Sequence, residues 1–193
     1  MMIVAGQSQS AYFLEEELPS TERSHTLSVL VDNEPGVLAR VVGLFSGRGY
    51  NIESLTVSEI EHASHMSRIT IVTTGRPPVI SQIMHQLGRL VPVHKVVNLT
   101  WAGDALEREL ALIKVCGKGE IRDEALRLAQ AFNARIVDAT LDSYVFEITG
   151  APADIDRFVG LMKDCGLVEL ARTGLAALSR GRNGITSAPA VAG

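Results

Sequence analysis

The stretch Asp32–Gly36 combines the residue types of an amino-acid binding site with the position of a helix start. It reads Asp-Asn-Glu-Pro-Gly, and proline suits the first turn of a helix because its missing N–H has no helical acceptor there. Backbone N–H groups near Gly36, Val37 and Leu38 would also lack helical acceptors, and together with the helix dipole they favour a bound carboxylate. The pattern therefore predicts a helix start that suits an anion.

Side chains around this turn supply the other groups that a free amino acid needs. Asp32 carries a charge that suits an ammonium group, and Asn33 offers an amide oxygen and amide donors. A second amide, Asn51, opens a later predicted strand beside the apolar Ile52. An ordinary helix cap with a turn asparagine explains the same residues, and the local sequence by itself favours that plain cap.

Other candidates for chemistry are weaker. His62 and His65 have H-x-x-H spacing, but they lie in a polar turn without a third ligand nearby, so we expect no metal site. The loop Cys116–Glu120 lies between a predicted strand and a helix and could hold an anion at the helix start. Its glycines are equally explained by the backbone conformation that a tight connection needs. Cys116 and Cys165 form no C-x-x-C motif and sit among apolar residues, which predicts two buried, reduced thiols.

Composition narrows the function class. The chain has 193 residues, 46% of them hydrophobic and 21% charged, which is typical of a globular protein with a buried core. The net charge of −4 argues against nucleic acid and against an anionic membrane. No apolar run approaches the ~20 residues of a membrane-spanning helix, and the N-terminus lacks the layout of a secretory signal. We therefore expect a cytoplasmic protein.

Two consecutive segments, residues 25–99 and 108–180, repeat one order of predicted elements. In the first, we expect strands at His25–Val31, Tyr50–Ser58, Met66–Thr73 and Val91–Leu99. One helix would have Pro35 in its first turn and end at Gly47 and Gly49, and another would start at Pro77 and carry Leu90. In the second, we expect strands at Arg108–Cys116, Ala134–Leu141, Tyr144–Thr149 and Leu167–Leu178, with a helix presenting Ile121, Ala125, Leu128 and Phe132 on one face and another from Pro152.

This order predicts an α+β protein of two tandem ferredoxin-like βαββαβ modules. Each module would hold a four-stranded antiparallel sheet with both helices on one face. The other face would need a partner, either the other module or a second chain. Residues 1–24, acidic at Glu15–Glu17, are expected to form a flexible N-terminal extension. Residues 100–107 would be the linker, and residues 181–193 a flexible tail.

A longer stretch resembles a known family. Residues 27–57, LSVLVDNEPGVLARVVGLFSGRGYNIESLTV, closely resemble the ACT domain of the acetolactate synthase (acetohydroxyacid synthase) small, or regulatory, subunit, and RGYNIESLTV is characteristic of that family. The resemblance continues in residues 107–115, 146–150 and 171–181, which look like its C-terminal domain. It covers roughly residues 25–181.

The resemblance implies a regulatory subunit without a catalytic site of its own. Members of the family form homodimers through their ACT domains and bind valine or another branched-chain amino acid at that interface. They activate a large catalytic subunit, which joins two pyruvates into 2-acetolactate with loss of CO2, and they confer feedback inhibition in branched-chain amino-acid biosynthesis. Thiamine diphosphate, Mg and FAD would belong to that catalytic partner, with no cofactor and no metal in this chain.

The family's effector-binding positions fall on nine residues of this sequence. They are Asp32, Asn33, Glu34, Pro35, Gly36, Val37 and Leu38 from one chain and Asn51 and Ile52 from its partner. By analogy, the N–H groups near Gly36 would hold the valine carboxylate. The amides of Asn33 and Asn51 would orient its polar end, and Ile52 would touch its isopropyl group.

Two other functions fit parts of the sequence. One is a stand-alone ACT sensor for a different amino acid. The other is an enzyme on a ferredoxin-like module, such as an acylphosphatase-like hydrolase at Cys116–Glu120, and the lack of an Arg–Asn pair in a fitting context counts against it.

Overall fold

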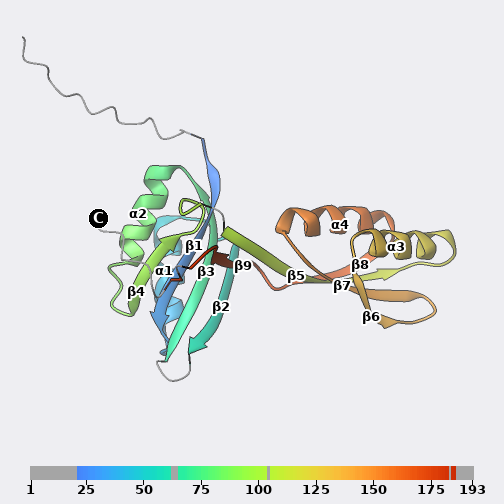
Figure 1. Cartoon of the computed structure of the whole chain (residues 1–193), viewed down its shortest axis with the longest axis horizontal. Helices are drawn as coiled ribbons and strands as arrows, with labels where there is room; N and C mark the ends of the chain where they lie inside the picture. Colours follow the sequence, from blue (N-terminus) through green and yellow to red (C-terminus); the bar gives the residue numbers. More distant parts are fainter. Residues whose placement is uncertain (1–20, 62–64, 104, 183, 186–193) are drawn as a thin grey trace, which may run out of the picture.

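The structure is a computed structural model that describes residues 21–61, 65–103, 105–182 and 184–185. Two α+β modules follow one another along the chain, as predicted (Figure 1). The predicted N-terminal extension lies outside the described residues up to residue 20. Its last residues do not fit the prediction, because Arg23 and Ser24 already belong to the first strand. Among the described residues, the helices are all too short or too polar to cross a membrane.

The elements follow the predicted order with one addition at the C-terminus. The first module contains β1 (Arg23–Asp32), α1 (Val37–Arg48), β2 (Ser54–Glu61), β3 (Met66–Gly75), α2 (Pro77–Leu87) and β4 (Val93–Asn98). The second contains β5 (Ala105–Cys116), α3 (Glu120–Ala131), β6 (Arg135–Ala139), β7 (Ser143–Gly150), α4 (Pro152–Asp164), β8 (Leu167–Arg172) and β9 (Ala176–Ser179).

The N-terminal sheet has the antiparallel order β2-β3-β1-β4. Alternate residues of β1, such as Leu27 and Val29, pack with Phe45 of α1 and Ile80 of α2 in the core between sheet and helices. The other face of β1 is also buried, because every residue from His25 to Val31 is less than a tenth exposed. The helix-free face, which was predicted to need a partner, is therefore covered in this part of the sheet.

The cover on that second face comes from the C-terminal end of the same chain. Leu175 and Ala177 form a small buried cluster with Leu99, against which Val72 and Val97 of the sheet pack. Ile185 is also buried, at 8% exposure, although it lies in the predicted flexible tail. Residues 183 and 186–193 of that tail lie outside the described residues.

The C-terminal sheet has the order β6-β7-β5-β8, with α3 and α4 on one face (Figure 1). Its core includes Ile113, Phe146 and Phe158, all fully buried. On the helix-free face, Leu112 stays 38% exposed, so the predicted bare face is present in this module.

Strand β5 joins the two modules. Its first residues, Ala105–Arg108, pair with β9 beside the N-terminal module, and its remainder pairs with β7 and β8. The strand predicted to start at Arg108 therefore starts at Ala105, within the predicted linker 100–107. The single predicted strand Leu167–Leu178 is two strands, since Gly174 takes a φ of +81° that breaks the extended backbone.

Smaller differences concern element ends. Strand β2 begins at Ser54 rather than at Tyr50, because the chain must first return from the helix layer to the sheet. Gly47 lies inside α1, and Gly49 alone ends the helix, with a φ of +70°. Leu90 falls beyond the end of α2, and Ile121 is 49% exposed on α3, where Ala125 and Ala129 provide the buried face.

Candidate effector site

The turn after β1 is fixed by backbone hydrogen bonds to neighbouring connections. The Asp32 N–H donates to the Pro92 carbonyl at 2.9 Å, and the Asn33 N–H donates to the His65 carbonyl at 2.6 Å. These bonds hold the end of β1 while the following residues, Glu34 to Gly36, stay exposed. The turn is thus a rigid, solvent-facing entry to α1.

Gly36 is the N-cap of α1, with φ +88° and ψ −9°. This left-handed conformation favours glycine, and a Cβ built there would meet no atom within 4 Å. No side chain caps the helix, and its first turn carries no acidic residue. The Val37 N–H donates to the Glu34 carbonyl at 3.4 Å, and the next N–H groups of the first turn, together with the helix dipole, suit an outside acceptor such as an amino-acid carboxylate.

The two apolar residues of this turn have different environments. Val37 is 4% exposed and packs into the core of the N-terminal module, so its side chain anchors the helix start. Leu38 is 40% exposed and stays available for contact with another molecule.

Asp32 already has a partner within the chain. Its Oδ1 lies 2.5 Å from Nε2 of His94, which comes from β4. Both side chains are partly exposed. A ligand ammonium group at this position would share the carboxylate with His94, a partner that the sequence did not indicate.

Asn51 and Ile52 lie at the opposite end of α1. The helix has 12 residues and is therefore about 18 Å long. The Asn51 carbonyl accepts a hydrogen bond from Thr73 Oγ1 at 2.6 Å, which ties this loop to β3. One chain does not bring the nine predicted residues together, so a site that contains all of them needs a second chain.

The edge beside α1 offers a surface on which a second chain could pair. Among the described residues, β2 pairs only with β3, so its outer edge is open. Val57 and Ile60 of β2 are 45% and 39% exposed, and Leu38 of α1 is similarly exposed. An antiparallel pairing of two such edges would bring the start of one α1 next to the end of the other.

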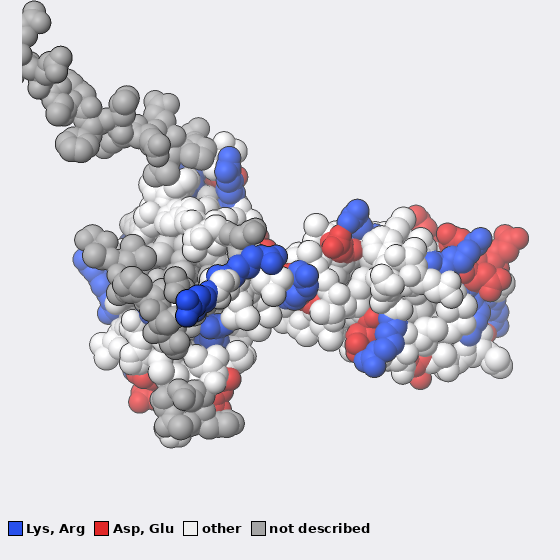
Figure 2. All heavy atoms as spheres, viewed as in Figure 1, with Lys and Arg blue, Asp and Glu red and all other residues white. Residues whose placement is uncertain are grey.

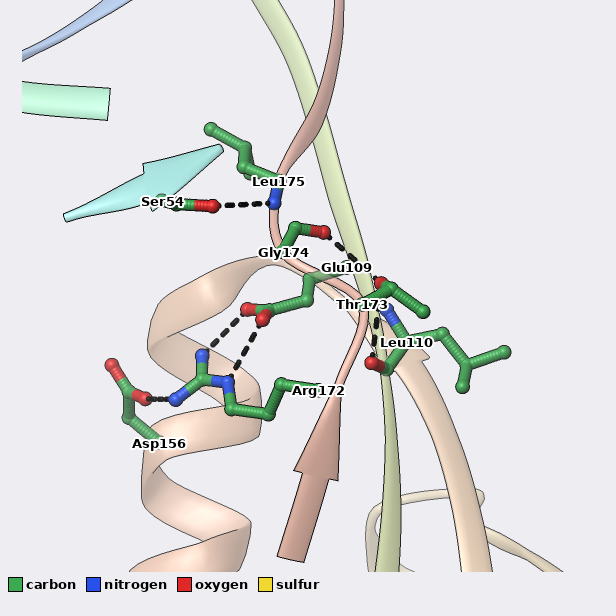
Figure 3. Close-up of polar contacts among 8 residues, drawn as sticks. All are labelled: Ser54, Glu109, Leu110, Asp156, Arg172, Thr173, Gly174 and Leu175. Carbon is green, nitrogen blue, oxygen red and sulfur yellow. Dashed lines mark hydrogen bonds and ion pairs between the residues drawn. The ribbon is translucent and has the colours of Figure 1, made fainter. Parts of the chain in front are cut away.

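A second set of polar contacts, which sequence reasoning missed, lies within the C-terminal module, next to the place where that module meets the N-terminal one (Figure 3). Arg172 donates from Nε and Nη2 to the two carboxylate oxygens of Glu109, at 2.9 and 2.5 Å, and from Nη1 to Asp156 at 2.7 Å. These carboxylates raise the pKa of Arg172 against the lowering effect of burial. The only sequence signal was a charged residue, Glu109, inside an apolar strand.

The turn that follows Arg172 touches the N-terminal module. The Leu175 N–H donates to Ser54 Oγ at 3.1 Å, and Thr26 Oγ1 donates to Glu107 Oε1 at 2.7 Å. Around these contacts lies a cleft of about 740 Å³ that both modules line. Figure 2 shows the two modules as separate lobes joined by a narrow waist. The contacts link β2, three residues after Asn51, with the C-terminal module.

His25 is buried at 3% exposure near the start of β1. Its Nδ1 lies 3.3 Å from Asn98 Nδ2, and its ring meets Trp101 edge-on at 5.5 Å between centroids. Burial lowers the pKa of His25, the charge of Arg23 lowers it further, and the Asn98 contact partly opposes both. The folded protein therefore favours neutral His25.

This lowered pKa predicts a loss of stability in acid. Because unfolded His25 binds a proton more readily than folded His25, the free energy of unfolding should fall as the pH drops below the ordinary histidine pKa of about 6.5. Urea unfolding at about pH 8 and about pH 5.5 measures the effect, and His25→Gln should make it smaller. An equal loss in the parent and in His25→Gln would show that other groups cause it.

The remaining predicted sites are less favourable. The start of α3 carries Glu120 and Asp123, whose charges oppose an anion in the loop Cys116–Glu120. A Cβ on Gly117 would lie 2.7 Å from Ile121 Cγ2, so close packing explains that glycine. His62 lies outside the described residues, among which no group of three His, Cys, Asp or Glu could hold a metal.

The two cysteines have different environments, which corrects the expectation of two buried thiols. Cys116 is exposed, whereas Cys165 is buried at 4% exposure, and both are free. Burial, with Glu124 and Asp164 nearby, raises the pKa of the Cys165 thiol. Only Cys165 fits the predicted role of a buried core residue.

Comparison with known proteins gives a consistent result across both modules. Residues 27–95 match the family described as the AHAS small subunit-like ACT domain, and residues 108–181 match the small subunit of acetolactate synthase. The probable acetolactate synthase small subunit of Archaeoglobus fulgidus is 48% identical over 157 residues, which are 81% of this chain and 97% of that protein. The isozyme 3 small subunit of Escherichia coli is 44% identical over 156 residues, which are 80% and 94% of the two chains.

A solved structure agrees with these sequences. The crystal structure of the acetolactate synthase small subunit from Thermotoga maritima superposes with a TM-score of 0.75 at 38% identity. The superposition covers 83% of this chain and 99% of that one. The similarity therefore extends through both modules.

Proposed function

Because the chain belongs to the acetolactate synthase small-subunit family, we propose that it regulates a catalytic acetolactate synthase subunit through valine or another branched-chain amino acid. As a small subunit, it acts with a catalytic subunit, and the reaction is that of the complex. Thiamine diphosphate, Mg and FAD would be cofactors of that partner. The cytoplasm would be the place where the complex works.

The observation that supports the effector site most is the separation of its two halves. The Asp32–Leu38 turn offers N–H groups at the start of α1, and Asn51 with Ile52 lies about 18 Å away at its other end. In a two-fold dimer through β2 and α1, two equivalent sites would form, each from the start of one α1 and the end of the other. Valine would then bind between the chains and stabilise their pairing.

Charge and shape in this arrangement suit an amino acid with a branched side chain. The uncapped helix start would receive the carboxylate, and the Asp32–His94 pair would lie near the ammonium group. Ile52 of the second chain and the exposed Leu38 would provide aliphatic contacts.

Reconstitution with the large subunit tests the function directly. We expect the purified chain to copurify with that subunit, to raise its acetolactate production, and to make that activity sensitive to valine. Calorimetry of the chain with each of the standard amino acids would separate this function from a sensor of another amino acid. Failure to bind or stimulate the large subunit would contradict the regulatory role, whatever amino acid binds.

The proposed dimer makes a prediction about Val57, in the middle of the open β2 edge. Val57→Arg should shift the protein from dimer to monomer and remove valine binding, because two arginines would face each other across a two-fold axis. Analytical ultracentrifugation measures the mass. Val168→Arg, an exposed position on β8, is the matched control and should leave the dimer intact. A Val57→Arg protein that stays dimeric would place the interface elsewhere.

A further inference from the structure

A groove separate from the effector turn runs between α2 and the outer edge of β4. It has a volume of about 500 Å³, and Trp101 lies among the residues that line it. Its apolar wall includes Met84, Val96 and the 46%-exposed ring of Trp101. Among the described residues, β4 pairs only with β1, so its outer backbone edge is open to an added segment.

The groove is basic although the chain as a whole is acidic. His85 and Arg89 of α2 and its following turn, with His94 and Lys95 of β4, all line it. No acidic residue is among the lining residues, while the net charge of the chain is −4. An occupant with apolar side chains and several carboxylates would match this surface.

The chain carries such a segment in its N-terminal extension. Residues 12–18 read Tyr-Phe-Leu-Glu-Glu-Glu-Leu, an apolar block followed by the acidic triplet Glu15–Glu17. Apart from this triplet, residues 1–20 contain no charged side chain. Apolar and acidic character are thus combined in one short stretch.

The start of β1 places this segment within reach of the groove. His25 contacts Trp101 edge-on, and the Thr26 N–H donates to Thr100 Oγ1 at 3.0 Å, so the chain enters β1 beside a residue that lines the groove. Five residues, 18–22, connect Glu17 to Arg23, and five extended residues span up to about 17 Å. No long connection has to form for the segment to dock.

From these observations we propose that residues 12–18 of the N-terminal extension dock in the groove between α2 and β4 of the same chain. Tyr12, Phe13 and Leu14 cover its apolar wall, and Glu15–Glu17 pair with the basic side chains, including Arg89. The lining of the groove also includes His94, which contacts Asp32 at the start of the effector turn. The groove and the effector turn are thus connected through the His94–Asp32 contact.

The only tryptophan of the chain reports on this docking. In the full chain, we expect Trp101 emission to be blue-shifted and its quenching by acrylamide to be about twofold weaker than in a chain lacking residues 1–20, because docking covers its exposed ring. High salt should bring the full chain close to the truncated one. Circular dichroism confirms that both proteins are folded.

Charge variants keep the test independent of truncation. Replacing Glu15, Glu16 and Glu17 together by Gln, or Arg89→Glu alone, should shift Trp101 emission of the full chain toward that of the truncated chain. Arg157→Glu, in the other module, is the control and should change nothing. Identical emission and quenching in full and truncated chains would overturn the proposal. If Trp101 of the truncated chain were also shielded from acrylamide, and more so at higher protein concentration, the groove would instead be occupied by a second copy of the chain.

Discussion

Gly36→Asp is expected to abolish valine inhibition of the reconstituted complex while the small subunit stays folded. The new carboxylate would occupy the uncapped start of α1, where the ligand carboxylate is proposed to bind, and would repel it. A Cβ at this position meets no atom within 4 Å, so the change creates no clash. The φ of +88° strains any side chain, but aspartate and asparagine tolerate this region best among non-glycine residues.

Gly36→Asn is the matched control, since it has the same shape and backbone strain without the charge. We expect the valine concentration for half inhibition to rise at least about tenfold for Gly36→Asp, equivalent to ~1.4 kcal/mol, and less for Gly36→Asn. Activation of the large subunit without valine should persist in both. An unchanged valine response in Gly36→Asp would exclude this helix start as the carboxylate site. Equal losses in both variants would assign the effect to backbone strain.

The second large effect is expected in the C-terminal module, beside the turn that contacts the N-terminal module. Arg172→Met would leave the Glu109 carboxylate, which is 7% exposed, without its two guanidinium hydrogen bonds (Figure 3). Removal of one partner from a buried ion pair typically costs 3–5 kcal/mol, and because Arg172 is itself about one-third exposed we expect about 2–3 kcal/mol. Urea unfolding of the isolated small subunit measures this loss.

Two further variants test whether the buried charge causes the loss. Arg157→Met removes an arginine that pairs with Asp154 on the surface of α4, and it should cost at most about 0.5 kcal/mol. The double variant Arg172→Met with Glu109→Gln should recover part of the stability, since a neutral amide is cheaper to bury than an unpaired carboxylate. If Arg172→Met were as mild as Arg157→Met, the Glu109 contact would contribute little to the fold.

The turn after Arg172 also connects the C-terminal module to the proposed effector site. Gly174 has no room for a side chain, since a Cβ there would lie 2.8 Å from Ser54 Oγ and 2.9 Å from Thr56 Oγ1. Ser54 is the first residue of β2 and follows the loop that holds Asn51 and Ile52. The C-terminal module therefore contacts β2 directly. The loop before β2 would contact a valine ligand bound at the start of α1 in the neighbouring chain.

The sequence by itself determined the order of elements and the location of the turn that we propose binds the effector. Hydrophobic periodicity, Pro35 at a helix start and the αL glycines Gly36 and Gly49 are local signals, so the elements could be predicted before any contact was known. The residue types around Asp32 and Asn33 likewise indicated which groups of an amino acid could bind there.

Only the tertiary structure decided how these parts meet. The extension of β5 through both modules, the break at Gly174 and the Arg172–Glu109 pair depend on partners more than 50 residues apart, about which local propensity carries no information. The same holds for the distance between the two ends of α1. The residues that the sequence assigns to one ligand site lie too far apart in a single chain, because helix α1 separates them. The proposed site therefore has to be formed by two chains.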